Sequence, residues 1–439
     1  MDMIKTDQTI AYHKNAPISG AWDVIVCGAG PSGIAAAVCA ARLGQKTLLL
    51  ERYGAVGGCL TLGHVTTIMG SVAKGGIRDE ILALLSSKSS ATAIESEDAK
   101  GLLVDFIQAN GVTFRLQTPV VDTVVSDGAA TGVIAQTQNG LVCFGARRVI
   151  DATGDGYVAA MAGCETMLGR DGDGLLQPVS LMYTVDGVDK ASTLFCKHEE
   201  HYTTLPDGRE YISLCKQAEK DGVLPKNVTI VRLYATGSPG ERLVNATQAN
   251  GINPLHDGDT ERAEVLLRSQ IARINQFLRA QIPGFEHIRT RGSASTLGVR
   301  ETRRIKGRYI LTAEDLIEGR RFEDCVVHRA SFAIDIHNPS GGGQSETDGR
   351  PHTTKPYDIP MRALQPLHIE NLIVCGRCIS GTHRAHASYR VMNIVMAMGQ
   401  AAGVMAAVSN QTETPVSELD YADVKRALLR QGCTLHSAD

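Results

Sequence analysis

Residues 22–51 read WDVIVCGAGPSGIAAAVCAARLGQKTLLLE, and this stretch decides the fold. Its first six residues are an apolar run rich in Val and Ile, which predicts a β-strand. The alanine-rich stretch 34–44 predicts a helix that ends at Gly44. A second apolar run, residues 46–50, predicts another strand. Strand, helix and strand in this order form a βαβ unit, so we predict a buried parallel sheet in an α/β fold.

The turn between the first strand and the helix contains Gly28, Gly30 and Gly33 in GxGxxG spacing. This spacing is weak evidence alone, but here a strand precedes it, a helix follows it, and Glu51 ends the next strand. Such a turn lets a pyrophosphate approach the backbone, and the helix N-terminus binds its charge. Glu51 would accept hydrogen bonds from a ribose. We therefore predict a dinucleotide site, with a glycine-rich connection in another α/β fold as the alternative.

The composition is that of an ordinary globular chain. Its 439 residues include 44 Lys and Arg against 47 Asp and Glu, a net charge of −3, and 43% are hydrophobic. These values exclude disordered and fibrous classes and leave no broad basic surface for nucleic acid or anionic lipid. Eleven scattered cysteines after a polar N-terminal stretch argue against a disulfide framework. We therefore expect a reducing compartment and a cytoplasmic protein.

Residues 391–408 (VMNIVMAMGQAAGVMAAV) are apolar for almost the length of a membrane span. A helix of this length would measure roughly 27 Å, slightly less than a bilayer core. Asn393 and Gln400 would lack hydrogen-bond partners in lipid. We interpret the segment as a buried core helix and expect no membrane span.

The remaining pattern indicates two kinds of structure. Asp-Gly at 127–128 and Asn-Gly at 139–140 predict hairpins, and thus a small antiparallel meander attached to the parallel sheet. Beyond residue 169 the pattern changes, with strands expected at 179–185 and 228–234 and an amphipathic helix at 260–279. This change predicts a second domain of mixed α+β structure.

Three stretches of the chain, 24–58, 149–156 and 371–403, resemble two-domain flavoproteins whose FAD domain is built like that of glutathione reductase and fumarate reductase. Residues 300–337 and the turn GRCIS at 376–380 are similar to the signature of the family called FAD-dependent oxidoreductase. The resemblance implies FAD and a redox reaction whose substrate differs among members. It also implies a discontinuous FAD domain, residues 21–169 and 346–439, preceded by a tail at 1–20 and interrupted by a substrate domain at 170–345.

The resemblance also implies which residues contact FAD. Expected at the pyrophosphate are Gly28, Gly30, Ser32 and Gly33; at the adenosine, Glu51, Arg52 and the backbone of Val120; at the phosphates and ribityl chain, Gly154, Asp155, Gly376 and Arg377; and at the flavin, Gly57, Gly58 and Cys59 together with the helix start at Val391 and Asn393. A helix N-terminus there would stabilise the negative charge of reduced flavin. Cys59 or His64 could tether the flavin covalently, but we expect non-covalent FAD.

The chain departs from the disulfide reductases in two ways. These enzymes carry a second cysteine five positions after the first, where this chain has His64 instead. No second GxGxxG follows a strand, so a dedicated NAD(P)H domain is absent. Cys375 and Cys378 have CxxC spacing, but a second pair of zinc ligands at suitable spacing is missing, and we expect no metal. Electrons therefore pass between FAD and a substrate, oxygen or a partner protein.

The expected reaction is hydride transfer from a C–H bond of a small polar metabolite to flavin N5. Such a reaction needs a base near the reacting carbon and cations that hold the substrate. Candidates are His337 as base, with His383, Arg390 and Arg300; we expect His337 and residues 383–390 to meet at one face of the flavin. The alternatives are reduction of an activated C=C bond, NAD(P)H-dependent hydroxylation, and a non-enzymatic flavin module for electron transfer.

Overall fold

The computed structural model describes residues 12–87, 94–192, 194, 204–343 and 352–435. Its strands are β1 (Ile18–Cys27), β2 (Thr47–Leu50), β3 (Thr113–Arg115), β4 (Val120–Ser126), β5 (Ala129–Thr137), β6 (Gly140–Asp151), β7 (Thr166–Leu168), β8 (Tyr183–Asp186), β9 (Arg232–Ala235), β10 (Arg242–Asn245), β11 (Arg289–Ser293), β12 (Arg303–Ile305), β13 (Cys325–Ala330), β14 (Tyr357–Pro360) and β15 (Leu372–Val374). Its α-helices are α1 (Pro31–Arg42), α2 (Ile77–Ser86), α3 (Ser96–Ala109), α4 (Tyr157–Met161), α5 (Tyr211–Lys220), α6 (Asp259–Gln281), α7 (Ala313–Glu318), α8 (His383–Tyr389), α9 (Met392–Gln411) and α10 (Tyr421–Arg430).

The largest sheet contains the predicted βαβ unit. Its strands lie in the order β3-β2-β1-β6-β5-β4, and β15 pairs with β6. β1 runs parallel to β2 and β6, whereas β4, β5 and β6 form the predicted antiparallel meander. All four residues of β2 are buried, because the sheet is covered on both faces. The predicted fold class, a Rossmann-like parallel sheet with a small meander, is confirmed.

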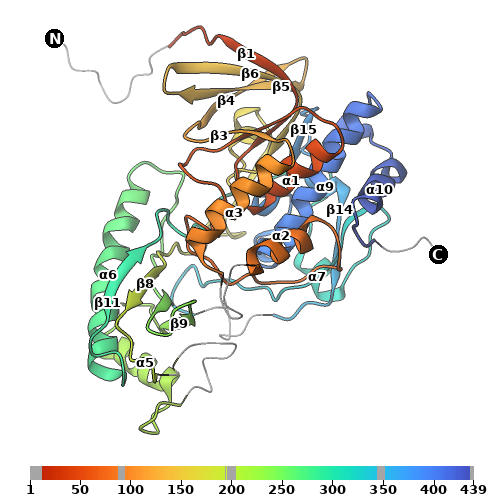
Figure 1. The fold of residues 1–439 in the computed structure, drawn as a ribbon. Helices are drawn as coiled ribbons and strands as arrows, with labels where there is room; N and C mark the ends of the chain where they lie inside the picture. Colours follow the sequence, from red (N-terminus) through yellow and green to blue (C-terminus); the bar gives the residue numbers. More distant parts are fainter. Residues whose placement is uncertain (1–11, 88–93, 193, 195–203, 344–351, 436–439) are drawn as a thin grey trace, which may run out of the picture.

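Helix α9 packs directly along α1 (Figure 1). A Cβ on Gly399 would lie 2.0 Å from the carbonyl oxygen of Ser32, and one on Gly403 would lie 2.2 Å from that of Ala36. The GxxxG spacing therefore allows α9 to pack so closely on α1 that the two helix backbones are in contact. Of the helices in the described ranges, α9 is the one long and apolar enough to cross a membrane. Its most apolar stretch is 94% buried inside the protein.

We predict that Gly403→Ala lowers the free energy of unfolding by about 2 kcal/mol, because the added methyl group forces α1 and α9 apart. Gly101→Ala in α3 is the matched control: no described atom lies within 4 Å of its Cβ position. The control should leave stability unchanged or raise it by up to about 1 kcal/mol through helix propensity. Urea unfolding of both variants tests this contact, and equal midpoints would contradict it.

The second domain has its own sheet and its own core. Its four antiparallel strands lie in the order β11-β8-β10-β9, and α5 and α6 pack with them, set apart from the first domain in Figure 1. Helix α6 spans Asp259–Gln281, which agrees with the helix predicted at 260–279. Leu267, Ile274 and Phe277 on its inner face are buried in the core of this domain. The inserted α+β domain is thus present.

The hydrophobic cores divide the chain at a different place from the predicted boundary. The core of the second domain takes residues from Val179 to Ala294. The first core resumes at Ile305 and includes Cys325 and Val327 of β13. Residues 305–330 therefore pack with the nucleotide-binding side, although the sequence placed them in the substrate domain at 170–345. The reason is that β13 pairs with β14, a contact between distant segments that local patterns do not reveal.

Two smaller expectations also need correction. β1 starts at Ile18 and pairs with β6 from Cys143 onward. The last residues of the expected tail at 1–20 are therefore part of a strand. Residues 1–11 of that tail lie outside the described ranges. The strand expected at 179–185 is shorter: Val179 and Ser180 form isolated bridges to two different segments, and β8 starts at Tyr183. The expected boundary at 345–346 also falls outside the described residues.

Candidate active site

The three glycines of the GxGxxG turn have different surroundings. A Cβ on Gly28 would lie 2.6 Å from the carbonyl oxygen of Ala152, and one on Gly33 would lie 1.8 Å from that of Gly28. Both positions need a bare backbone. A Cβ on Gly30, in contrast, would meet no described atom within 4 Å. Gly30 is the N-cap of α1 and makes no side-chain cap, so the first N–H groups of the helix are available for an anion, and a pyrophosphate fits here.

Two further glycine segments press against this turn. A Cβ on Gly58 would lie 3.0 Å from Cα of Gly30, and the N–H of Gly57 donates to the turn at 2.7 Å. A Cβ on Gly376 would lie 2.8 Å from Oγ of Ser32. The structure thus brings together predicted contact residues that are more than 300 positions apart in the chain.

Glu51 lies beside the same turn. Its carboxylate accepts hydrogen bonds from the backbone N–H groups of Ala29 (2.7 Å) and Tyr53 (2.9 Å), and burial raises its pKa. The backbone carbonyl of Glu51 accepts from the N–H of Thr118 (2.8 Å), which brings Val120, the first residue of β4, to this side of the sheet. Glu51 and the start of β4 therefore lie close together, and their contact with the adenosine stays a prediction.

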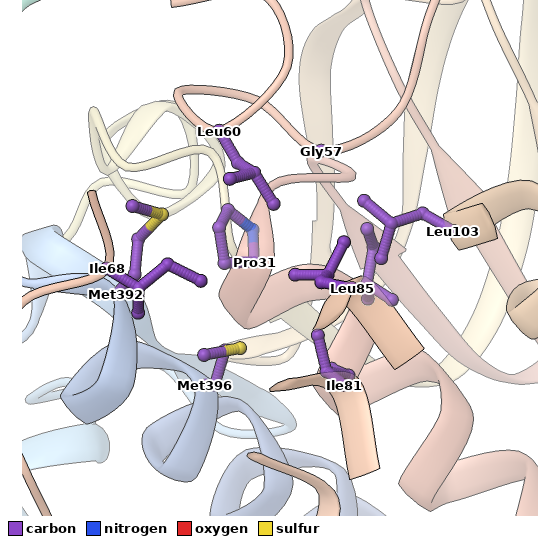
Figure 2. Close-up of a pocket in the computed structure, with 10 residues that line it drawn as sticks. Pro31, Gly57, Leu60, Ile68, Ile81, Leu85, Leu103, Met392 and Met396 are labelled. Atoms are coloured by element: carbon purple, nitrogen blue, oxygen red, sulfur yellow. The ribbon is translucent and has the colours of Figure 1, made fainter. Parts of the chain in front are cut away.

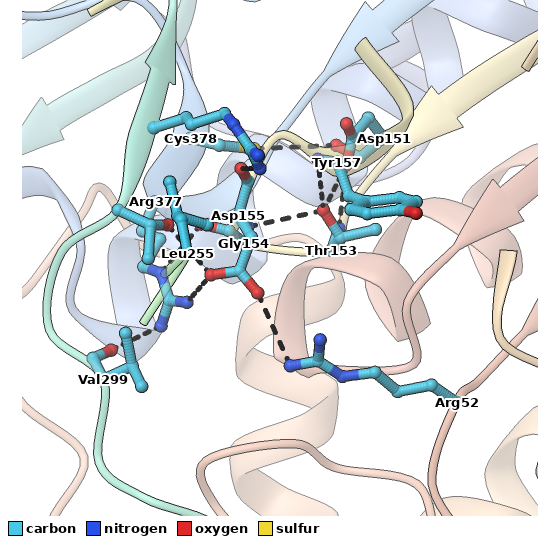
Figure 3. Close-up of polar contacts among 12 residues, drawn as sticks. Arg52, Asp151, Thr153, Gly154, Asp155, Tyr157, Leu255, Val299, Arg377 and Cys378 are labelled. Atoms are coloured by element: carbon cyan, nitrogen blue, oxygen red, sulfur yellow. Dashed lines mark hydrogen bonds and ion pairs between the residues drawn. The ribbon is translucent and has the colours of Figure 1, made fainter. Parts of the chain in front are cut away.

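Asp155 joins two of the predicted cationic residues (Figure 3). Arg377 pairs with its carboxylate and also donates to the carbonyl of Gly154 at 2.7 Å. Arg52 lies 3.4 Å from the same carboxylate, and Thr302 donates to it at 2.9 Å. Burial would raise the pKa of Asp155, but Arg377 and Arg52 outweigh it and hold the pKa below its usual value. The Arg52 side chain is 53% exposed, so it can turn to a ligand at little cost.

Cys59 is exposed and follows the two glycines at 57–58. Desolvation by the surrounding protein raises the pKa of its thiol, whereas the positive charges of Arg377 and Arg390 act to lower this pKa. Both guanidinium groups therefore lie near the sulfur. Burial lowers the pKa of His64, and the charges that act on it belong to α3. Cys59 therefore lies near Arg390, whereas His64 lies near the charged residues of α3.

The start of α9 is held by the segment around Gly70. Asn393 donates from Nδ2 to the carbonyl of Gly70 at 2.7 Å, and a Cβ on Gly70 would lie 2.5 Å from Cγ2 of Val391, the N-cap residue. The Oδ1 atom of Asn393 is buried and has no hydrogen-bond partner among the described residues. This unpaired oxygen at the start of α9 could accept a hydrogen bond from an N–H group of a bound flavin ring.

His337 lies in a compact cluster with Gln177, Arg300, Asp335 and Arg390, named here the His337 cluster. Nε2 of His337 is 3.6 Å from the Asp335 carboxylate, and a guanidinium nitrogen of Arg390 is 3.7 Å from it. Arg390 also donates to the Asp335 carbonyl at 3.0 Å. Oε1 of Gln177 accepts from the backbone N–H of His337 (3.2 Å) and from Arg390 (3.4 Å). His337 and Arg390 therefore lie in the same cluster, and their placement at one face of the flavin stays a prediction.

The cluster has an unusual charge state because it is buried. Burial and the charge of Arg300 lower the pKa of His337 to about 4, although Asp335 acts in the opposite sense. Burial and the charge of Arg390 lower the pKa of Arg300 to about 9. Burial also lowers the pKa of Arg390, whose surroundings include Asp335 on one side and Arg377 and Cys59 on the other. Arg390 thus links the His337 cluster to the expected flavin side.

His383 belongs to a neighbouring buried network. It starts α8 and lies 2.8 Å from the carboxylate of Glu301, which also pairs with Arg304. The same carboxylate accepts from the backbone N–H of Gln177 at 3.2 Å. Burial, together with Arg304 and Arg390, holds the pKa of His386 well below its usual value. His383 is therefore connected to the His337 cluster through Glu301 and Gln177.

Sequence reasoning missed three residues of this arrangement. Gln177 lies in the segment before β8, and its neutral side chain carried no motif signal. Asp335 and Glu301 also carried no motif signal, and the structure places Glu301 in a buried ion pair with Arg304. The spacing Asp335-Ile336-His337 places both side chains on one face of an extended segment and could have indicated the pair.

Two residues of the His337 cluster, Arg300 and His337, line a small polar cavity. Its polar lining residues are Asn227, Thr229, Arg232, Asn245, Thr247, Gln248, Arg300 and His337. A second cavity lies between α1, α2, α3 and α9 (Figure 2). Its side chains are apolar, including Leu60, Ile81 and Met396, so it is a dry space of the core and offers nothing to a polar substrate.

The CxxC pair has the properties of buried structural thiols. Cys375 and Cys378 are both fully buried, and burial raises the pKa of Cys375 to about 12. Thiols with raised pKa are poor nucleophiles and poor metal ligands. Cys375 and Cys378 are therefore structural residues of the turn that follows β15.

Within the described ranges, one other group of side chains has the spacing of metal ligands: Cys325, His328 and Asp358, whose donor atoms lie within 4.8 Å of one another. Arg321 pairs with the Asp358 carboxylate at 2.8 Å. This guanidinium already supplies the positive charge that a metal would bring. The group is therefore better explained as an ion-pair network.

The fold and the glycine-rich turn define a dinucleotide-binding flavoprotein. The chain belongs to the FAD dependent oxidoreductase family, whose model matches residues 23–428. It is an oxidoreductase, and FAD is its cofactor. A short stretch of 55 residues is 52% identical to dihydrolipoyl dehydrogenase of Trypanosoma brucei brucei, and this stretch spans 12% of each chain.

Similar solved structures have low identity to this chain. A geranylgeranyl bacteriochlorophyll reductase-like protein from Thermoplasma acidophilum is 15% identical, with a TM-score of 0.45 over 93% of this chain and 83% of the other. The anhydrotetracycline hydroxylase OxyS from Streptomyces rimosus is 12% identical, with a TM-score of 0.44 over 94% and 66%. A myxobacterial chondrochloren halogenase is 14% identical, with a TM-score of 0.41 over 94% and 79%. These likenesses say nothing of the substrate.

Proposed function

We propose that the protein oxidises a C–H bond of a small polar metabolite, with His337 as the base. The observation that carries this proposal is the state of His337: a buried histidine with a pKa of about 4, at the wall of a polar cavity and next to two arginines. Such an imidazole is neutral near pH 7, and the Asp335 carboxylate 3.6 Å away would stabilise the imidazolium formed when it accepts a proton. The arginines supply positive charge for an anionic or oxygen-rich substrate.

The residues expected at FAD offer the groups that such a dinucleotide needs. The open space at Gly30 and the N-terminus of α1 would take the pyrophosphate, Glu51 the ribose, and the region of Cys59, Arg377 and the start of α9 the flavin. We propose that FAD is bound non-covalently. When bound, it supplies the acceptor for the two electrons removed from the substrate, and oxygen or an acceptor protein then reoxidises it.

The chain's own residues would do three things. Arg300 and Arg390 would hold the anionic part of the substrate beside His337. The His337 imidazole would take the proton of the substrate's hydroxyl or amine group as the C–H bond breaks. Asp335 would stabilise the imidazolium that results, because its carboxylate lies 3.6 Å away. Glu301 and His383 would fix Gln177, and through it the backbone of His337.

A second candidate is reduction of an activated C=C bond, which needs a proton donor. Burial and the charge of Arg390 lower the pKa of Arg300 to about 9, which makes this guanidinium a stronger acid than usual. The electrons would then have to come from NAD(P)H or an electron-donor protein. NAD(P)H-dependent hydroxylation and a non-enzymatic electron-transfer role are the remaining alternatives, and the polar cavity beside His337 favours an enzyme over the latter.

Anaerobic mixing of the oxidised holoenzyme with classes of metabolites tests the proposal. Loss of the visible flavin absorption in the absence of NAD(P)H would support dehydrogenation. Reoxidation of chemically reduced enzyme by an alkene substrate would instead establish the reductase. In separate aerobic turnover assays, a requirement for both NAD(P)H and oxygen would establish the hydroxylase. Any outcome without bleaching by a saturated substrate contradicts the first proposal.

The pH dependence should report the lowered pKa of His337. Arg300 and Arg390 face the imidazole and lower its pKa, Asp335 faces it and raises it, and burial dominates, so the folded pKa is about 4. The value of kcat/KM, which reports the free enzyme, should therefore stay level as the pH falls through about 6.5 and decline only towards pH 4. The free energy of unfolding should depend on pH in the same direction. The part of it that depends on neutral His337 is fully present above about pH 6.5 and is lost as the pH falls towards 4. An acid limb at pH 6.5 or above would contradict this account.

A further inference from the structure

Several buried polar atoms of the His337 cluster lack partners among the described residues. They are Nε2 of Gln177, Nε of Arg390 and Oδ1 of Asp335. Gln177 is 1% exposed, and its other amide atom is fixed by His337 and Arg390. A buried polar group without a partner costs about 1–3 kcal/mol, so these atoms favour a bound molecule, water or ligand, that pairs with them. A ligand that pairs with all three must offer acceptors to two donors and a donor to one carboxylate.

The charge of the cluster limits the ligand further. Arg300 and Arg390 carry two positive charges, Asp335 carries one negative charge, and His337 is neutral near pH 7, which leaves one net positive charge. A cationic ammonium group would be repelled, and a neutral molecule would leave the charge unbalanced in a buried site. An anion is preferred. A carboxylate has the planar pair of acceptors that an amide and a guanidinium can bind together.

The cavity beside the cluster is suited to hydroxyl groups. Asn227 and Gln248 line it, and their amide nitrogens already donate to the protein, to Asn250 at 3.1 Å and to Gly341 at 2.7 Å. Their amide oxygens are the atoms that can accept from a ligand. Thr229 and Asn245 add further hydrogen-bonding side chains to the wall. A row of amide and hydroxyl side chains binds a chain of hydroxyl groups better than an apolar tail.

We propose that the substrate is a polyhydroxylated carboxylate, a sugar acid in the chemical sense. Its carboxylate would accept from Gln177 Nε2 and Arg390 Nε, and Arg300 would balance its charge. One hydroxyl group would face His337, a neighbouring one would donate to Asp335 Oδ1, and the rest would extend into the cavity. Gln177 is then a residue that determines specificity. This inference rests on the proposed function for the role of His337, but it concerns binding and can be tested without turnover.

Titration calorimetry of the oxidised holoenzyme tests it with matched probes. D-Gluconate carries both features, sorbitol lacks the charge, lactate lacks the chain of hydroxyls, and glucosamine carries the opposite charge. D-Gluconate should bind at least about tenfold more tightly than each of the other three, the scale of one good interaction. Sorbitol binding equally well would overturn the anionic part of the proposal, and lactate binding equally well would overturn the polyhydroxylated part.

Variants identify the site. Gln177→Glu keeps the acceptor that holds His337, removes the free donor and places a negative charge against the carboxylate; D-gluconate should bind at least about tenfold more weakly. Arg300→Gln should weaken binding similarly and serves if Gln177→Glu does not fold. Arg289→Gln, whose side chain is 79% exposed on β11, is the matched control and should bind as the wild type does. Equal affinity in all three variants would contradict the proposed site.

The outcomes also separate this inference from the proposed function. If D-gluconate binds and depends on Gln177 and Arg300 but does not bleach the flavin anaerobically, the binding inference stands and dehydrogenation of this class fails. If sorbitol, lactate or glucosamine bleaches the flavin while D-gluconate does not bind, dehydrogenation stands and the inference about the substrate class is wrong.

Discussion

His337→Ala is expected to slow reduction of the flavin by substrate about a hundredfold or more, the usual effect of losing a positioned base. FAD should remain bound, because the glycine-rich turn and Glu51 are formed by other segments of the chain. The buried cluster should keep its charge, since Asp335 still pairs with Arg390. Anaerobic rapid mixing, followed through the visible flavin absorption, measures the rate directly.

His368→Ala is the control for this prediction, because the His368 side chain is 78% exposed and its ion pair with Glu165 is at the surface. This variant should reduce its flavin at the wild-type rate. If His337→Ala also keeps the wild-type rate, His337 is not the base, and His383 or His386 becomes the next candidate.

Gly30→Val is expected to abolish FAD binding while leaving the fold intact. The backbone of Gly30 has φ −74° and ψ −178°, which any residue adopts, and its Cβ position meets no described atom within 4 Å. A valine there should therefore not strain the protein, yet it would fill the space proposed for the pyrophosphate. A clash of several kcal/mol corresponds to at least about a hundredfold loss of affinity.

The measurement is the FAD content of purified protein, followed by reconstitution with added FAD and by circular dichroism. Gly292→Val in β11 is the matched control, because its Cβ position also meets no described atom and it lies in the other domain. The control should be fully yellow. A yellow Gly30→Val protein with stoichiometric FAD would show that the pyrophosphate lies elsewhere.

The nucleotide-binding half of the fold could be predicted because its signals are local. The apolar run before Gly28, the turn glycines and Glu51 all lie within one βαβ unit, and the structure gives β1, α1 and β2 in those positions. The interpretation of residues 391–408 also depended on local chemistry. Polar Asn393 and Gln400 indicated a protein environment, and α9 is indeed buried inside the protein.

The substrate side could be predicted only in part, because its residues are assembled from distant segments. Gln177, Arg300, Asp335 and Arg390 come from four separate stretches, and hydrogen bonds between these stretches place them together. No spacing in the sequence encodes that a neutral glutamine would hold the backbone of His337. The extent of the substrate domain was overestimated for the same reason, since β13 finds its partner β14 beyond the expected boundary.

The central claim is that His337 faces the reacting carbon of a substrate held by the arginines of its cluster. A crystal structure of the oxidised holoenzyme with a non-reacting substrate analogue tests this claim most directly. The account predicts the His337 ring within hydrogen-bond reach, roughly 2.6–3.2 Å, of the substrate's reacting hydroxyl or amine group, with flavin N5 on the other side of the reacting carbon. A ligand bound beside the flavin with the His337 ring outside contact distance would contradict it.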